Sequence, residues 1–512
     1  MSTPRSQMDD RRTKLARLRE LGVDPYGARF ENVTSAAAAR ARAEQLGVRP
    51  EQMWSDERFR LAGRIVLLRQ FGNLFFLTLR DDSGDIQIGL SKRHLPTQWP
   101  VVKLLDLGDI IGVDGCLGTT KTAEVTLWAD QLTFLTKALR PPPEKWHGLT
   151  DVELRYRRRY VDLFSNPEVR DVFKARSTII QAVRTYLAGR GFLEVETPML
   201  QAQYGGAAAR PFITHHNALD IDLYLRISPE LYLKRLLVGG FPRVYEINRN
   251  FRNEGISTRH NPEFTMMEVY QAYGDYHDMM ALVEGIFAAG IEALDGRYRR
   301  PFGEHTIDYT PPWRRAAYAE LFEEHAGVPM TDIAAVRAKA ASLGIDPAKM
   351  DDAVVINEVF EHTVEDKLIQ PTFVLDYPAP LCPLTRRRSD NPDIALRFEP
   401  FIAGMEVGNA YTELNDPDIQ EANLRAQLAG QEETMAVMDD DFVTALQYGM
   451  PPAGGLGVGI DRMVMLLTNR TSIRDVILFP LQRPLPRSES ADASDTGDEA
   501  TERRSDEGNA SA

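Results

Sequence analysis

Cysteine is scarce in this chain of 512 residues, with only Cys116 and Cys382 and no CxxC pair. This scarcity argues against a disulfide scaffold or a structural zinc site, and it fits a reducing cytosol. No apolar run reaches the ~18 residues that a membrane span needs. The first residues, MSTPRSQMDDRR, lack the apolar core of a signal peptide. We therefore expect a cytoplasmic protein with no membrane partner.

Basic residues are fewer than acidic residues, and the net charge is −14. Much of the acidity comes from the last residues, 488–512, which contain no aromatic and no large aliphatic side chain. Such a segment cannot bury enough apolar surface to fold, so we predict a disordered acidic tail. Residues 8–21, in contrast, have helical spacing and carry five basic residues. These form either a solvated helix face or a set of phosphate contacts.

The remaining chain predicts three further parts. Residues 1–58 read as an N-terminal helical extension, with Thr34 and Ser35 as helix caps. Residues 59–140 contain about five short β-rich runs with tight turns, a pattern typical of an OB-fold barrel. The proline run after Arg140 marks a boundary, and residues 141–487 mix helices and strands in one large domain.

Charged residues crowd the stretch FRNEGISTRHNPEFTMMEVYQAY, residues 251–273. We predict two antiparallel strands joined by a loop. Alternation puts Phe264, Met266, Glu268 and Tyr270 on one face, and Arg252 and Glu254 likewise share a face. One cross-strand ion pair leaves other charges unexplained, and buried charges without partners are costly. A ligand that carries both signs of charge satisfies more of them.

A glycine-rich segment, GGLGVGIDR, occupies residues 454–462 and precedes an apolar helical run. We expect a glycine-rich turn there, which serves either close helix packing or the approach of the backbone to a ligand. The P-loop pattern GxxxxGK[ST] is absent.

Three strings together resemble the motifs of class II aminoacyl-tRNA synthetases, in the same order. They are GRGFLEVETPML (189–200), FRNEG with RHNPEF, and GLGVGIDR. Longer strings, among them RISPELYLKRLLVGG (226–240) and GNAYTELNDP (408–417), resemble the lysyl-tRNA synthetases. The resemblance covers about residues 8–486.

The resemblance implies an α+β fold, in which an OB-fold β-barrel that binds the anticodon precedes an antiparallel sheet flanked by helices. It implies a homodimer, with Pro198 at the interface. It also implies a reaction in which L-lysine and ATP form lysyl-adenylate, and the lysyl group passes to the 3′ end of tRNA(Lys).

Residue roles follow from the same resemblance. It gives Arg252 and Arg462 catalytic roles, and it assigns ATP binding to Arg252, Glu254, His260, Asn261, Phe264 and Arg462. Mg²⁺, which prefers oxygen ligands, is assigned to Glu399 and Glu406. Their seven-residue spacing requires a bend, which Gly404 can supply. A set of surface carboxylates is the alternative.

Lysine carries two cations, so two acidic poles are expected. The resemblance gives the α-amino group to Glu230 and the Gly206 backbone, with Ser228 as an N-cap and Pro229 as the first helical residue. It assigns the ε-ammonium of lysine to Glu268, Glu413 and Tyr270. It assigns the lysine carboxylate to Asn409, and it makes Tyr411 a wall of the lysine pocket. Anticodon contacts fall to Arg69, Phe76 and Gln87; barrel core is the alternative for Phe76.

Two other functions remain open at this point. An aspartyl or asparaginyl enzyme of the same subclass would need a cationic side-chain pocket, against which Glu268 and Glu413 argue. A paralogue that is not a synthetase is the other. A lysyltransferase that acts on an elongation factor would lack the OB-fold, and a regulatory RNA-binding protein would have lost Arg252, Arg462 or a metal carboxylate.

Overall fold

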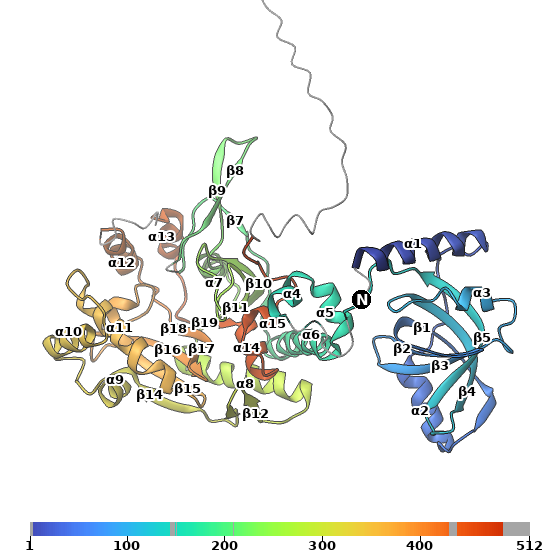
Figure 1. The fold of residues 1–512 in the computed structure, drawn as a ribbon. Coiled ribbons are helices and arrows are strands. Elements are labelled where there is room, and N and C mark those ends of the chain that lie inside the picture. The colour runs from blue at the N-terminus through green and yellow to red at the C-terminus, as the bar shows by residue number, and fades with distance from the viewer. Residues whose placement is uncertain (1–3, 144–148, 150, 208, 430–437, 485–512) are drawn as a thin grey trace, which may run out of the picture. The chain divides into compact units, whose positions relative to one another are not determined.

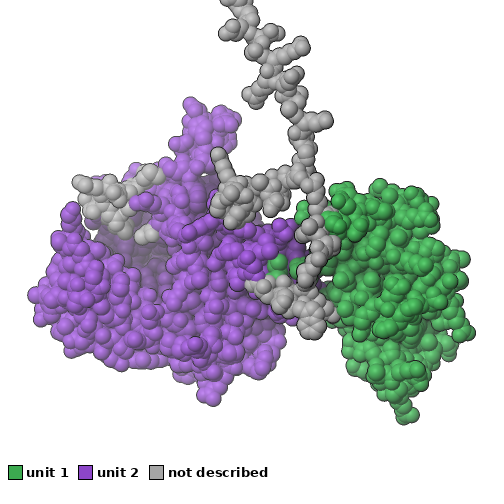
Figure 2. Space-filling model, in the orientation of Figure 1, with its two compact units in different colours: residues 1–150 green, residues 151–512 purple. Residues whose placement is uncertain are grey.

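The computed structural model describes residues 4–143, 149, 151–207, 209–429 and 438–484. The chain divides into two compact units, Met1–Thr150 and Asp151–Ala512 (Figure 2). The predicted acidic tail, 488–512, lies outside the described residues. The boundaries at 58, 140 and 487 stay predictions. Within the described part of the chain, no helix has both the length and the apolar character for a membrane span.

The first unit begins with two helices. Helix α1 spans Pro4–Glu20, and α2 spans Ala36–Leu46 with Ser35 as its N-cap, as predicted. Two of the basic residues on α1 turn toward the barrel. Arg11 is buried and donates to the carbonyl oxygens of Leu107 and Ala138 at 2.9 and 2.8 Å, and Lys14 lies 2.6 Å from Asp106. Their charges therefore attach the helix to the barrel.

Five strands close the barrel in the order β1-β2-β3-β5-β4 (Figure 1). Strand β1 begins at Met53, ahead of the expected start at Phe59. Alternate residues of β2, such as Leu77 and Leu79, point into the core. The elements of the barrel are β1 (Met53–Phe71), β2 (Leu74–Arg80), β3 (Asp85–Ser91), α3 (Trp99–Val102), β4 (Ile110–Thr119) and β5 (Val125–Thr136).

The second unit is built on a nine-stranded sheet. The strands from β15 to β10 pair antiparallel, and only the edge strands β14 and β6 pair parallel to their neighbours. The predicted α+β class is thereby confirmed. In sheet order the strands are β14 (Arg314–Ala317), β15 (Thr372–Pro378), β16 (Ile394–Ile402), β18 (Gly408–Thr412), β19 (Ala453–Gly459), β11 (Glu263–Ala272), β10 (Arg243–Phe251) and β6 (Leu193–Glu194), with β17 (Met405–Glu406) on β16.

Helices cover both faces of this sheet. On one face α6 (Pro167–Gly189), α8 (Tyr276–Leu294) and α14 (Ile460–Leu467) pack over Met267 and Val269 of β11. On the other face α7 (Glu230–Val238) and α13 (Asp440–Gln447) pack near Val244 and Tyr270. The two faces of β11 thus carry different chemistry: one is core, and the other holds Glu268 and Tyr270.

Smaller elements surround the sheet. Helices α9 (Tyr318–Ala326), α10 (Ile333–Ser342) and α11 (Asp352–Thr363) form a satellite core, and β8 (Phe212–His216) with β9 (Ile221–Leu225) projects as a hairpin (Figure 1). The others are α4 (Val152–Arg157), α5 (Arg159–Ser165), β7 (Leu200–Gln201), β12 (Arg299–Phe302), β13 (His305–Asp308), η1 (Glu365–Lys367), η2 (Ala379–Leu381), α12 (Pro417–Ala429) and α15 (Ile473–Val476).

Candidate active site

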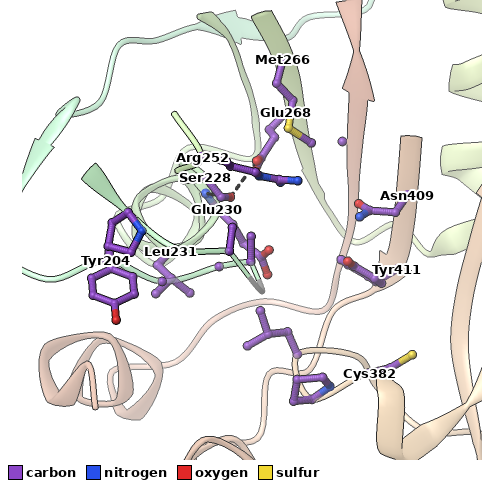
Figure 3. Close-up of a pocket in the computed structure, with 18 of the residues that line it drawn as sticks. Tyr204, Ser228, Glu230, Leu231, Arg252, Met266, Glu268, Cys382, Asn409 and Tyr411 are labelled. Carbon is purple, nitrogen blue, oxygen red and sulfur yellow. Dashed lines mark hydrogen bonds between the residues drawn. The ribbon is translucent and has the colours of Figure 1, made fainter. Parts of the chain in front are cut away.

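A cavity of about 1620 Å³ opens over the centre of the sheet in the second unit. Figure 3 shows Arg252, Glu230 and Glu268 on one side of it, with Asn409 and Tyr411 on the other. Most of the site residues expected in this unit line it: Gly206, Glu230, Arg252, Glu254, Glu268, Tyr270, Glu399, Glu406, Asn409 and Tyr411. His260, Asn261, Phe264, Glu413 and Arg462 are not among its lining residues.

Glycines form the floor between the two walls. Glu268 of β11 and Asn409 of β18 both pair with Gly457 of β19, and Tyr270 and Tyr411 both pair with Gly455. A Cβ on Gly455 would lie 1.8 Å from Glu413 Oε1, and one on Gly457 would lie 2.5 Å from Met266 Cε. The expectation of a glycine-rich turn was wrong. These residues form a strand, whose Leu456 and Val458 fill the core while the glycines leave room above.

Glu268 is buried in the cavity wall without a cation of its own. The Ser228 hydroxyl donates to Glu268 Oε1 at 2.8 Å, and the Tyr270 hydroxyl donates to Oε2 at 3.1 Å. Burial, together with the nearby Glu230 carboxylate, raises the pKa of Glu268 to about 8. The site therefore favours a cationic group that would return this carboxylate to its charged form.

Lys234 is the residue that the sequence analysis missed. Its Nζ lies 2.6 Å from Glu230 Oε1 and 2.6 Å from Glu413 Oε2, and its side chain is fully buried. Burial alone would lower the pKa of Lys234, but the two carboxylates outweigh it and raise that pKa. Burial raises the pKa of Glu413 to about 7, although Lys234 opposes the shift. The i,i+4 spacing of Glu230 and Lys234 was a usable signal for the first pair.

The start of α7 differs by one residue from the prediction. Pro229 is the N-cap, and Glu230 is the first helical residue. Ser228 still serves the helix end, because its hydroxyl accepts a bond from the Glu230 amide at 3.1 Å. Gly206 lies against this turn with φ +84°, and a Cβ there would be 3.1 Å from Ser228 Oγ. Only glycine fits this position without strain.

A loop joins β10 to β11 and holds four of the residues predicted to bind the nucleotide: Arg252, Glu254, His260 and Asn261. Strand β10 ends at Phe251, so Arg252 and Glu254 lie in this loop and not on a strand face as expected. The Arg252 guanidinium lies 5.2 Å from the ring centroid of Phe264. Asn261 is buried and donates to the Glu263 carbonyl oxygen at 2.6 Å, which fixes the end of the loop.

Arg462, in the first turn of α14, contacts two other predicted site residues, Glu406 and His260. It donates to the Glu406 carbonyl oxygen at 2.5 Å, and its other nitrogen lies 3.2 Å from His260 Nε2. Burial and the Arg462 charge lower the pKa of His260. The loop, the β17 carboxylate and α14 thereby meet at one end of the cavity.

Glu399 and Glu406 lie on the hairpin of β16 and β17. The predicted bend at Gly404 is present with φ +67°, and Phe401 pairs with Glu406, so alternation brings both glutamates to one face. Tyr377 donates to Glu399 Oε2 at 2.7 Å, and Arg397 also binds Glu399. Burial, with the charges of Glu361, Glu399 and Glu406, raises the pKa of Glu365 to about 8. Glu399 and Glu406 offer the oxygen ligands that Mg²⁺ prefers, but the described residues contain no group of three or more His, Cys, Asp or Glu side chains placed to hold a metal ion.

On the barrel, Arg69, Phe76 and Gln87 line a second cavity of about 900 Å³. Gln87 donates to Thr126 Oγ1 at 2.8 Å, and Arg69 donates to Gln87 Oε1 at 3.5 Å. Phe76 lies on the outer surface between the core residues Phe75 and Leu77, so the barrel-core alternative does not hold.

Comparisons with known proteins agree with this architecture. Residues 151–483 match the family described as tRNA synthetases class II (D, K and N), and residues 59–135 match the OB-fold nucleic acid binding domain. The fold and these matches define a class II tRNA synthetase.

Individual relatives indicate which family of class II tRNA synthetases the chain belongs to. A lysine–tRNA ligase of Pelotomaculum thermopropionicum is 53% identical over 489 residues, covering 93% of this chain and 94% of the relative. A lysine–tRNA ligase of Carboxydothermus hydrogenoformans is 52% identical, and the match covers 92% of this chain and 96% of the relative. The chain belongs to the lysine–tRNA ligase family of class II tRNA synthetases.

Proposed function

We propose that this protein activates L-lysine with ATP and transfers it to the 3′ end of tRNA(Lys). The observation that carries the proposal is the charge of the cavity. Glu230, Glu268 and Glu413 are buried there, and Lys234 forms ion pairs with two of them, Glu230 and Glu413. Three carboxylates and one ammonium leave a negative charge of two when all are ionised, and lysine brings two cationic groups.

Lysine lies along the glycine floor in this proposal. Its α-amino group binds Glu230 and the Gly206 backbone, and its ε-ammonium binds Glu268, with Tyr270 and Glu413 beside it. Asn409 contacts the substrate carboxylate, and Tyr411 forms the wall. Uncharged isosteres are rejected because they would leave desolvated glutamates without partners. The fit of Gly206 against Ser228 supports this orientation, as does the close packing of Glu413 and Tyr270 over Gly455.

ATP binds at the loop end of the cavity. Adenine stacks on Phe264, its amino group donates to Glu254, and Arg462 covers the other face of the ring. His260 reaches the distal phosphates, and Asn261 adds a minor contact. Arg252 binds both the α-phosphate and the lysine carboxylate, which suits a planar guanidinium better than a point charge.

The reaction then proceeds in two transfers. A lysine carboxylate oxygen forms a bond to the α-phosphorus, and pyrophosphate leaves. The 3′-terminal hydroxyl of the tRNA next attacks the lysyl carbonyl carbon, and AMP leaves. Arg252 and Arg462 hold the anionic reactants in line and stabilise the charge that develops on the phosphates.

Glu399 and Glu406 would hold Mg²⁺, which neutralises phosphate charge when it is bound. Their oxygens are the ligand type that the ion prefers. Burial, with the charges of Glu361, Glu399 and Glu406, raises the pKa of the neighbouring Glu365. Arg397 and Tyr377 orient Glu399 toward the cavity.

The barrel binds the anticodon through Arg69, Phe76 and Gln87, and the enzyme is a homodimer. Pro198 is exposed between the exposed residues Leu193 and Leu200, an apolar edge that suits a contact with a second copy. A cytoplasmic location stays a prediction of the sequence.

Charging of tRNA tests the function. The full chain is incubated with ATP, Mg²⁺, a tRNA(Lys) transcript and one labelled amino acid: lysine, aspartate or asparagine. We expect labelled tRNA only with lysine. Label from aspartate or asparagine, or none from any of the three, would contradict the proposal.

A further inference from the structure

A row of side chains crosses the outer face of the barrel beside the predicted anticodon contacts. Strand register pairs Arg69 with Phe76, Phe76 with Gly89, and Gly89 with Trp128. Residues paired in this way share one face of a sheet. Their sequence neighbours Leu77, Ile88 and Leu127 point to the opposite face and fill the core. Trp128 therefore lies on the same surface as Phe76 and Arg69.

Two glycines make room for the Trp128 ring. A Cβ on Gly89 would lie 2.5 Å from Cε3 of the indole, and one on Gly118 would lie 3.0 Å from its Cδ1 and Nε1. The indole thus lies across both glycines, with one face against the strand backbone. Trp128 lines the cavity of about 900 Å³ together with Phe76, so part of the indole is open to a ligand.

Phe71 extends the row on its other side. Its side chain is 60% exposed, an unfavourable position for a large apolar ring without a partner. The ring centroids of Phe71 and Phe76 are 6.2 Å apart, and those of Phe76 and Trp128 are 5.7 Å apart. Neighbouring rings meet edge to face, with interplanar angles of 68° and 70°, so the three aromatic side chains form one contiguous row across β1, β2 and β5.

Polar groups surround these rings. Arg69, Gln87 and Glu124 line the same cavity and offer both donors and acceptors. Flat rings that are edged by hydrogen-bonding groups suit the faces and edges of unpaired bases. A base-paired helix hides its base faces, so a single-stranded loop is the matching occupant.

We propose that Phe71 and Trp128 stack on the bases that flank the base on Phe76, so that this surface holds the unpaired bases of the tRNA anticodon loop. The proposal rests on the proposed function, and it adds two base-binding residues to the predicted set.

Two leucine variants test it in the full-length chain. Phe71→Leu and Trp128→Leu each keep an apolar side chain and remove the aromatic face. We expect each to weaken binding of a tRNA(Lys) transcript roughly 5- to 100-fold, as the loss of one stacked base predicts. Tyr26→Leu, which changes an exposed aromatic residue elsewhere on this unit, should leave affinity unchanged. Lysine-dependent ATP–pyrophosphate exchange, a property of the other unit, should not change in any variant.

Salt dependence separates stacking from charge. The two leucine variants should keep the native slope of log affinity against log salt concentration, because no phosphate contact is lost, whereas Arg69→Gln should reduce it. An anticodon stem–loop with one abasic position should bind the native chain more weakly. When the abasic position is the one that stacks on the replaced ring, the leucine variant should bind this stem–loop with the same affinity as the intact stem–loop.

Native affinity in both leucine variants would overturn the proposal, as would a loss of tRNA binding that is accompanied by an equal loss of exchange. If Trp128→Leu fails to fold, the tRNA affinity of the Phe71→Leu variant alone tests the proposal, because Phe71 is exposed. Exchange that is absent in the native chain, with ring-dependent RNA binding still present, would refute the proposed function and leave the base-binding row standing.

Discussion

Lys234 and Glu413 form an ion pair beneath the acidic cavity, with 2.6 Å between Nζ and Oε2 and no exposure of either side chain. Lys234 binds Glu230 at the same distance. Lys234 thus binds two of the three glutamates of the site, Glu230 and Glu413, and forms no ion pair with Glu268. In the proposed function, lysine supplies the remaining positive charge.

Removal of Lys234 should destabilise the catalytic unit. Lys234→Met leaves two buried carboxylates without a cation, so we expect a loss of about 3–5 kcal/mol in the free energy of unfolding. Urea unfolding measures it. Arg425→Met breaks an exposed i,i+4 pair with Glu421 and should cost less than about 0.5 kcal/mol. The double variant Lys234→Met/Glu413→Gln should recover part of the loss. A native-like unfolding curve for Lys234→Met would show that the pair contributes little.

Glu268 should select lysine without affecting ATP. Glu268→Gln replaces a charged acceptor by a neutral amide, so we expect the KM for lysine to rise about 10- to 100-fold, while the KM for ATP changes little. Steady-state exchange kinetics measure both constants. Glu263→Gln, at the exposed start of the same strand, is the matched control and should behave like the native chain. Equal increases in the two KM values would instead indicate a structural role for Glu268.

Lysine binding should strengthen as pH rises toward 8. The pKa of Glu268 is raised to about 8 in the free site, so below that pH the carboxyl is mostly protonated and must release a proton to bind an ammonium. The KM for lysine should therefore fall up to tenfold per pH unit between pH 6 and 8, and then level off. Calorimetry in buffers of different ionisation enthalpy should detect proton release at pH 7. A KM that does not vary with pH in this range would contradict the assignment of Glu268.

Loss of a metal carboxylate should change the magnesium requirement. Glu406→Gln removes one charged oxygen ligand, so we expect half-maximal exchange to require a several-fold higher Mg²⁺ concentration. A titration of Mg²⁺ at saturating ATP and lysine measures it. Glu320→Gln removes an exposed carboxylate of α9 that does not line the cavity, and serves as the control. An unchanged Mg²⁺ curve for Glu406→Gln would remove this residue from the metal site.

Local patterns predicted much of this site. Alternation along β11 correctly put Met266, Glu268 and Tyr270 on one face, and the need for a bend between Glu399 and Glu406 was met at Gly404. Both features depend on neighbours in sequence, which a single chain displays directly.

Features that depend on distant segments were missed. The run of glycines was predicted as a turn because its strand character comes from pairing with β11 and β18. Lys234 was not singled out in the sequence, since only the fold brings Glu413 to it. The position of Trp128 beside Phe76 was also missed. It depends on the register between β3 and β5, which the periodicity of one strand does not specify.

Amino-acid-dependent ATP–pyrophosphate exchange tests the central claim most directly, because it needs no tRNA and reports the cavity alone. With lysine, aspartate and asparagine compared at equal concentrations, we predict exchange with lysine and none above background with the other two. Exchange with aspartate or asparagine, or no exchange with lysine, would contradict the account of an acidic cavity that selects and activates lysine.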